Sequence, residues 1–235
     1  LGCASHSFLG LVAIADAARP EVAESIAQCR AAGISVVMLT GDAPETARAI
    51  GEHIGLIQKH EEVVTGDQLR EYSDDVLRQQ LANIRIFARV TSEDKLRIVS
   101  AFQQMGHIVA VTGDGVNDAP ALKKAEVGVA MGKTGTDVAK EASDIVITDD
   151  NFATIAAAIE EGRTILTNLT RAMSYLLSCN FGEIIAILLA VLAGFPLPIS
   201  PLAILWLNMV TDSLPALALA VEPKGHHGLF HHASN

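Results

Sequence analysis

The chain has 235 residues, enough for one or two domains, and 50% of them are hydrophobic while 19% are charged. Its formal net charge of −10 argues against nucleic acid as a partner, because binding to nucleic-acid phosphates requires a basic surface. The three cysteines, Cys3, Cys29 and Cys179, have no paired spacing, which fits a reducing compartment and neither a disulfide framework nor a zinc site.

Predicted strands and helices alternate over residues 1–150. Short apolar runs predict strands at Leu11–Ala15, Ile34–Leu39, Ile84–Ala88, Ile108–Val111, Val127–Met131 and Ile145–Thr148. Helix signals predict helices from Pro20 to Gly33, over Ala43–Gly55, over Asp67–Leu81 with Asp67 or a neighbour as the cap, from Ser92 to near Gly106, and onward from near Asp118. Strands separated by helices predict an α/β fold, with a parallel sheet covered by helices on both faces.

A Thr40-Gly41-Asp42 turn follows the predicted strand Ile34–Leu39. A threonine hydroxyl and backbone N–H groups at the end of a strand can hold phosphate oxygens without adding charge. The turn therefore favours a phosphate site at this strand end, although by itself it is modest evidence.

Lys95 lies in the first turn of the helix for which Ser92 is the expected N-cap. The helix dipole disfavours a lysine at this place, so a side chain in solvent is one interpretation. A side chain directed at a phosphoryl group is the other interpretation.

The segment Thr112–Lys123, with the sequence TGDGVNDAPALK, is the most informative part of the chain. We expect Gly113 and Gly115 to let the backbone turn sharply where a side chain would clash. The turn places Asp114 and Asp118 together beyond the carboxyl end of a strand, where open α/β sheets hold their sites. Paired carboxylates suit Mg²⁺, which binds one or two of them with water and a substrate phosphate. The alternative is an ordinary strand-to-helix turn rich in Gly, Asn and Asp.

The order of these three motifs resembles the haloacid-dehalogenase-type phosphorylation domain. The sequence of the segment TGDGVNDAPALK closely resembles that of the matching segment in P-type cation-transporting ATPases. This resemblance runs from about Leu11 to about Pro223, nearly the whole chain, so that a chance match is excluded in practice.

The resemblance implies roles for the motif residues. Asp114 matches the direct Mg²⁺ ligand, and Asp118 and Asn117 match residues that support this site. The Thr-Gly-Asp turn matches the one beside the aspartyl phosphate, and Lys95 matches the lysine that neutralises its charge. Mg²⁺ is therefore the implied cofactor, and ATP is the implied substrate of the longer pump.

The phosphorylated aspartate of the family belongs to an Asp-Lys-Thr-Gly-Thr segment, and this sequence contains no such segment. Covalent phosphoryl transfer requires an acceptor group, so we expect the chain alone to be inactive. The nucleotide-binding domain, the actuator domain and earlier transmembrane helices are expected to precede Leu1. The chain is thus interpreted as a carboxyl-proximal part of a pump, whose missing remainder is its partner.

Residues beyond the phosphorylation domain predict a membrane segment. We expect a stalk helix over 151–174 and transmembrane spans over about 175–193 and 202–221, within a hairpin over 175–223. Basic residues flank the ends of the hairpin, namely Arg163, Arg171 and Lys224. They place both ends and the phosphorylation domain in the cytoplasm. Membrane lipid is then a partner. A soluble helical hairpin buried in a large core is the alternative.

Polar side chains inside the two spans predict a binding site for a transported cation. The first span carries Asn180 and Glu183 on one face, and the second carries Asn208, Thr211 and Asp212. Carboxylates in hydrocarbon are costly, so they should face the protein interior or a cation, and many oxygen ligands favour Ca²⁺. Hydrogen bonding between helices would explain a single Asn or Thr, but explains two carboxylates poorly. The segments also look like the fifth and sixth transmembrane helices of Ca²⁺-transporting P-type ATPases, in which the five matching residues are ion ligands.

Three functions remain open. The leading one is part of an ATP-driven pump that couples formation and hydrolysis of an aspartyl phosphate to transport of a cation, with Ca²⁺ favoured. The second is a membrane-anchored phosphatase-like domain, and the third is an inactive membrane protein that binds cations or a partner. The His-rich tail over 224–235 could bind a transition metal, but we expect a short disordered end.

Overall fold

The computed structural model describes residues 19–223, so the predicted strand Leu11–Ala15 and the His-rich tail lie outside the described residues. The chain forms two compact units. The first contains the described residues up to Ala27 together with Val36–Ala130 and Gly135–Ile145, and the second contains Gln28–Ser35, Met131–Thr134 and the described residues from Val146 onward.

The predicted parallel sheet is present as two three-stranded sheets. One has the strand order β1-β3-β2 and the other β4-β5-β6. Their bounds are Met38–Leu39 for β1, Val63–Thr65 for β2, Ile86–Ala88 for β3, Ala110–Gly113 for β4, Val127–Met131 for β5 and Ile145–Ile147 for β6. The pairs β1–β3, β2–β3 and β4–β5 are parallel, which confirms the α/β class. β1 and β4 each lie at the edge of a sheet.

Helices connect the strands. They are α1 (Pro20–Ala31), α2 (Pro44–His53), α3 (Gly66–Glu71), α4 (Asp74–Leu81), α5 (Ser92–Gln104), a 3-10 turn (Val116–Asp118), α6 (Ala119–Lys124) and α7 (Asp137–Ala142). The side chains that cover the first sheet are fully buried, including those of Leu69, Leu77, Leu81, Phe87 and Ile98. This core fixes the ends of β1 and β3, where two of the predicted motifs lie.

Two of the predicted helices differ in continuity or in their cap, and α7 was not predicted. The single helix expected over Asp67–Leu81 is divided into α3 and α4, because Tyr72 is extended and Ser73 caps a new helix by accepting from the Val76 N–H. The cap of α5 is Thr91 rather than Ser92. Both corrections follow from side chains that capture free N–H groups at a helix start.

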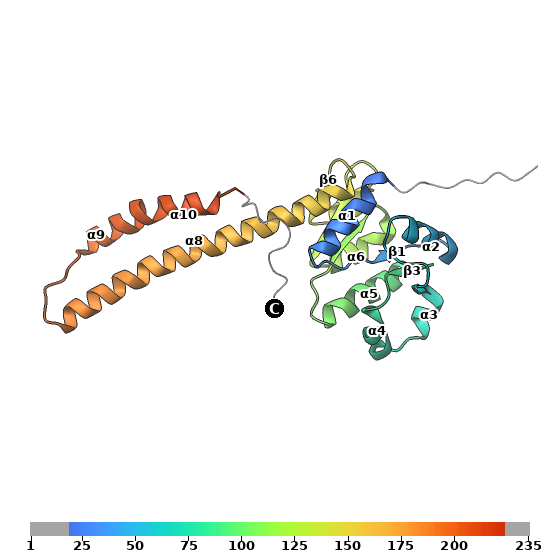
Figure 1. The fold of residues 1–235 in the computed structure, drawn as a ribbon, viewed down its shortest axis with the longest axis horizontal. Coiled ribbons are helices and arrows are strands. Elements are labelled where there is room, and N and C mark those ends of the chain that lie inside the picture. The colour runs from blue at the N-terminus through green and yellow to red at the C-terminus, as the bar shows by residue number, and fades with distance from the viewer. Residues whose placement is uncertain (1–18, 224–235) are drawn as a thin grey trace, which may run out of the picture. The chain divides into compact units, whose positions relative to one another are not determined.

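The second unit is dominated by two helices that are long and apolar enough to cross a membrane. One is α8 (Phe152–Leu192), a single helix of 41 residues that includes both the predicted stalk and the first predicted span. The other consists of α9 (Pro201–Trp206), a π-helical segment (Leu207–Asp212) and α10 (Ser213–Ala220). Figure 1 shows them as an antiparallel hairpin, with α10 beside α8. Most of their large apolar side chains are exposed, as expected for helices that contact lipid or further helices.

Asp150 fixes the backbone just before α8. Its carboxylate accepts hydrogen bonds from the backbone N–H groups of Lys133 (2.9 Å) and Thr134 (2.8 Å), and its φ is +56°. Aspartate and asparagine tolerate this left-handed conformation better than most residues. The hydrogen bonds, that from Lys133 first, lower the pKa of Asp150 to about 2.

The lowered pKa of Asp150 predicts a pH-dependent stability. Because the folded pKa lies below the unfolded value of about 3.9, this stabilisation is complete above that value and is lost as the pH falls through about 2. We expect Asp150→Asn to lower the Tm by about 2–8 °C near neutral pH, and the difference to vanish between about pH 4 and pH 2. Thermal unfolding followed by circular dichroism across this range measures it. A difference that is constant with pH would contradict the assignment.

Candidate functional site

The Thr-Gly-Asp turn directly follows β1. The Thr40 hydroxyl donates to Asp42 Oδ2 (2.9 Å) and accepts from the Asp42 N–H (3.1 Å), which closes the turn. The carbonyl of Thr40 accepts from the Val90 N–H and that of Asp42 from the Arg89 N–H. The turn is thereby held beside the residues that lead from β3 into α5.

Lys95 and Asp118 meet although they are 23 residues apart in sequence. Lys95 Nζ lies 2.5 Å from Asp118 Oδ1, and their side chains are 17% and 15% exposed. The other oxygen of Asp118 accepts from the Gly115 N–H at 3.2 Å. Asp118 is thus engaged by a cation and by the backbone, whereas Asp114 and Asn117 are exposed. The Asp114 carbonyl accepts from the Thr136 N–H at 2.8 Å, which fixes the backbone of the turn.

A capping box that the sequence analysis missed holds the start of α5. Asp94 is 4% exposed and accepts from the Thr91 N–H, from the Thr91 hydroxyl and from Arg70 Nη1. The signal was in the sequence, because Thr-x-x-Asp before an apolar run is a variant of the capping-box pattern. This box orients the helix turn that carries Lys95.

The two glycines of the TGDGVND turn are not equivalent. A Cβ atom on Gly113 would lie 2.5 Å from Asp118 Cβ, whereas the nearest atom to a Cβ on Gly115 would be 3.6 Å away. Gly115 also has an ordinary extended backbone, with φ −99° and ψ 162°. The expectation that a side chain would clash therefore applies to Gly113 and is wrong for Gly115.

This difference predicts that Gly113→Ala displaces Asp118 from Lys95, while Gly115→Ala leaves the pair in place. Overpacking of this kind costs about 1–3 kcal/mol. We expect a corresponding fall in the free energy of unfolding for Gly113→Ala and a change within about 0.5 kcal/mol for Gly115→Ala. Urea titration of the two variants side by side measures both. Equal losses would show that the close approach of Asp118 is not what requires glycine.

In the membrane helices, the predicted cation ligands differ in exposure. Asp212 is buried, Asn208 and Glu183 are half-buried, and Asn180 and Thr211 are exposed. Asn208 Oδ1 and Asp212 Oδ2 are buried without a hydrogen-bond partner in the described part of the chain. Both residues lie in the π-helical segment, a distortion that is frequent at functional sites. Over residues 19–223, no cluster of three or more His, Cys, Asp or Glu residues forms a metal site by itself.

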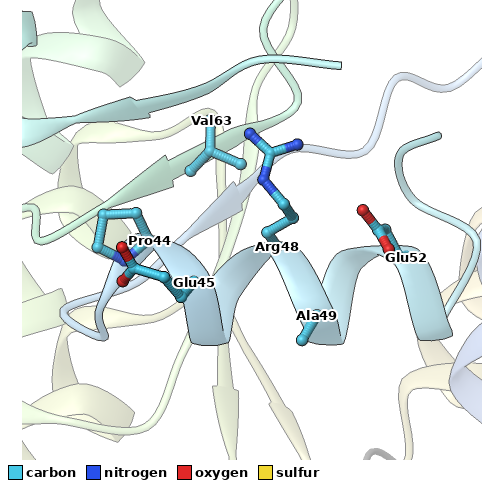
Figure 2. Close-up of a pocket in the computed structure, with 6 residues that line it drawn as sticks. All are labelled: Pro44, Glu45, Arg48, Ala49, Glu52 and Val63. Atoms are coloured by element: carbon cyan, nitrogen blue, oxygen red, sulfur yellow. The ribbon is translucent and has the colours of Figure 1, made fainter. Parts of the chain in front are cut away.

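A surface pocket lies along α2, the helix after the Thr-Gly-Asp turn (Figure 2). Its lining residues are Pro44, Glu45, Arg48, Ala49, Glu52 and Val63. Arg48 is held by a hydrogen bond from Nη1 to the Glu61 carbonyl (2.8 Å). The pocket contains none of the residues predicted for phosphoryl transfer.

The sequence model of the haloacid dehalogenase-like hydrolase family matches residues 2–126, more than half of the chain, and a second model of that description matches residues 94–159. The chain belongs to the haloacid dehalogenase-like hydrolase family. Residues 196–229 of this family member also match the model described as "Cation transporting ATPase, C-terminus".

Similar proteins confirm the resemblance to P-type cation-transporting ATPases. The family member is 53% identical over 220 residues to a calcium-transporting ATPase of Bacillus subtilis. The matched residues make up 93% of this chain and 25% of that ATPase. The family member is 47% identical over 224 residues to the endoplasmic reticulum calcium ATPase srcA of Aspergillus fumigatus, with 94% and 23% covered. The chain thus spans about a quarter of the length of these relatives.

A solved structure agrees with the fold. The crystal structure of a zinc-transporting PIB-type ATPase in the E2.Pi state is similar with a TM-score of 0.61 and 28% identity, over 87% of this chain and 27% of that one. Together with the two apolar helices, these matches confirm the predicted location in a membrane. The haloacid dehalogenase-like protein is an integral membrane protein with its globular domain in the cytoplasm.

Proposed function

We propose that this chain is part of an ATP-driven pump that transports a cation across a membrane, and that this cation is Ca²⁺. The observation that carries the proposal is the pair of buried, unpaired oxygens of Asn208 and Asp212. An unpaired buried oxygen is costly, and a bound cation would satisfy both. The calcium-transporting relatives support Ca²⁺ over other ions.

The remaining predicted ligands would add oxygen atoms to this site. Glu183 and Asn180 on α8 would add a carboxylate and an amide oxygen, and Thr211 a hydroxyl. The Asn180 amide nitrogen donates to the Leu176 carbonyl at 2.8 Å, which is consistent with an oxygen left free to bind a cation. Ca²⁺ takes six to eight such oxygen ligands, so further ligands from the rest of the protein would be needed.

The globular domain would supply phosphoryl transfer. Asp114, supported by Asn117 and Asp118, offers the oxygen ligands that suit Mg²⁺, and Mg²⁺ would neutralise charge on the phosphate oxygens. Lys95 would stabilise the transferring group, and the Gly41 N–H would bind its oxygens. The Thr40 hydroxyl and the Asp42 N–H would join it by exchanging the hydrogen bonds that now close the turn for bonds to phosphate oxygens. These positions are consistent with the Lys95–Asp118 contact and with the strand-end location of both turns.

The reaction proposed is formation and hydrolysis of an acyl phosphate. A carboxylate oxygen attacks the γ-phosphorus of ATP, the bond to the bridging oxygen breaks, and ADP leaves; water later releases inorganic phosphate. The acceptor carboxylate would come from a part of the protein outside this sequence, which has no Asp-Lys-Thr-Gly-Thr segment. β1 and β4 are edge strands, so a further strand can pair with either of them.

ATP-dependent ion uptake into vesicles tests the proposal. The full-length protein that contains this segment is placed in sealed vesicles, and accumulation of Ca²⁺ is compared with that of Zn²⁺ and Mn²⁺. We expect uptake of Ca²⁺ that requires both ATP and Mg²⁺. Uptake of only another cation would contradict Ca²⁺ as substrate, and ATP hydrolysis independent of any transported cation would contradict the pump.

A further inference from the structure

Asn168 is the only polar residue among the four buried residues of α8. It is 5% exposed, and its Nδ2 donates to the backbone carbonyl of Glu222 at 2.7 Å. Glu222 lies two residues after Ala220, the last residue of α10. This hydrogen bond therefore joins the predicted stalk part of α8 to the end of the second membrane helix. The two residues are 54 positions apart in sequence.

A second contact between the same segments is weaker. Arg171 Nη1 lies 3.1 Å from the Glu222 carboxylate, but the side chains are 57% and 49% exposed. Exposed ion pairs contribute little, with a median of about 0–1 kcal/mol. A buried amide that loses its partner costs more, because the group stays desolvated. The Asn168 hydrogen bond is therefore the contact that selects one arrangement of the two helices.

We propose that Asn168 is a positioning residue that sets the antiparallel register of the hairpin, and with it the depth at which the cation ligands meet. Counted from the Asn168–Glu222 contact, a rise of 1.5 Å per residue puts Asn180 and Glu183 about 18 and 22 Å along α8. Asp212 and Asn208 lie 10 and 14 residues before Glu222, which is at most about 15 and 21 Å along the second helix, because its π-helical segment rises less per residue than an α-helix. The polar residues of both helices therefore fall within a few ångströms of the same depth when this contact is formed.

A slip of one helical turn would separate these depths. It moves the ligands of one helix by about 5.4 Å relative to the other, which is more than their spread when the contact is formed. Metal sites tolerate only a few tenths of an ångström in ligand distance. The role in cation binding rests on the proposed function, whereas the role in register does not.

Two readouts test the proposal in the full-length protein. Disulfide cross-linking between cysteines introduced around Ala172 on α8 and around Ala216 on α10, with Cys179 replaced by serine, reports the register. Cation-dependent phosphorylation by ATP reports the apparent cation affinity. The variants are Asn168→Ala, Asn168→Gln, which keeps the donor but lengthens the side chain, and Arg171→Ala as the matched control.

We expect both Asn168 variants to change the set of cysteine pairs that cross-link and to lower the cation affinity at least about 10-fold, as loss of residues that orient metal ligands does. Arg171→Ala should leave both readouts within about 2-fold of the wild type. An unchanged cross-linking pattern in both Asn168 variants would overturn the proposal, as would a changed pattern with unchanged affinity. If the wild type showed no cation dependence, the proposed function would fail, and the cross-linking pattern would still decide the register.

Discussion

Replacing Lys95 by alanine is expected to lower the rate of phosphoenzyme formation from ATP in the full-length protein by about 100- to 1000-fold. This is the usual effect of removing one group that stabilises charge in the transition state. Lys95 is largely buried and its ammonium group is held 2.5 Å from Asp118, so little reorganisation is needed when a phosphoryl group enters. Rapid-quench measurement with labelled ATP determines the rate.

Lys59→Ala is the matched control for this prediction. Lys59 is an exposed lysine in the loop between α2 and β2, so its removal changes the net charge equally without touching the site. We expect the control to keep the wild-type rate. A similar rate in Lys95→Ala would mean that Lys95 does no more than hold Asp118.

Asp212→Asn is expected to have the second large effect. Asp212 Oδ2 is buried and unpaired, so the negative charge there is what a divalent cation would neutralise. Loss of that charge should lower the apparent cation affinity at least about 100-fold, because a ligand itself is removed rather than its orientation. The measurement is phosphorylation by ATP as a function of free Ca²⁺.

A second measurement on Asp212→Asn separates binding from chemistry. Phosphorylation by inorganic phosphate would run the proposed hydrolysis step backwards without using the membrane ligands, so it should stay at the wild-type level. Glu183→Gln should behave in the same way. Cation-dependent phosphorylation that is unchanged in both variants would remove these residues from the ion site.

The helices and strands with a strong local pattern were predictable from the sequence. β5 was predicted with its bounds, because the run of five residues is bordered by Glu126 on one side and by Gly132 and Lys133 on the other. The continuous path of α8 was also visible, since no proline or glycine cap interrupts it before Gly194. The pairing of Lys95 with Asp118 was not predicted, because the sequence analysis assigned Lys95 to the phosphoryl group and Asp118 to the Mg²⁺ site.

Other features depend on contacts that the sequence does not encode locally. β2 is three residues long and follows two glutamates, so its apolar pattern was too short to recognise. The strand expected over Ile34–Leu39 is reduced to Met38–Leu39, because only these residues pair with β3. The difference between Gly113 and Gly115 arises from a side chain five residues after Gly113, which no rule on glycine in turns would reveal.

Because α8 is long and unbroken, a small tilt at its start moves its membrane part by several ångströms. Asn180 lies about 43 Å along the helix axis from Asn151, where the helix begins. A tilt of about 5° at that base would sweep Asn180 through about 4 Å, if the helix moves as a rigid rod. The bond from Ca²⁺ to an oxygen is only about 2.3–2.6 Å long. A tilt of a few degrees at the base of α8 would therefore be enough to open or close the proposed cation site.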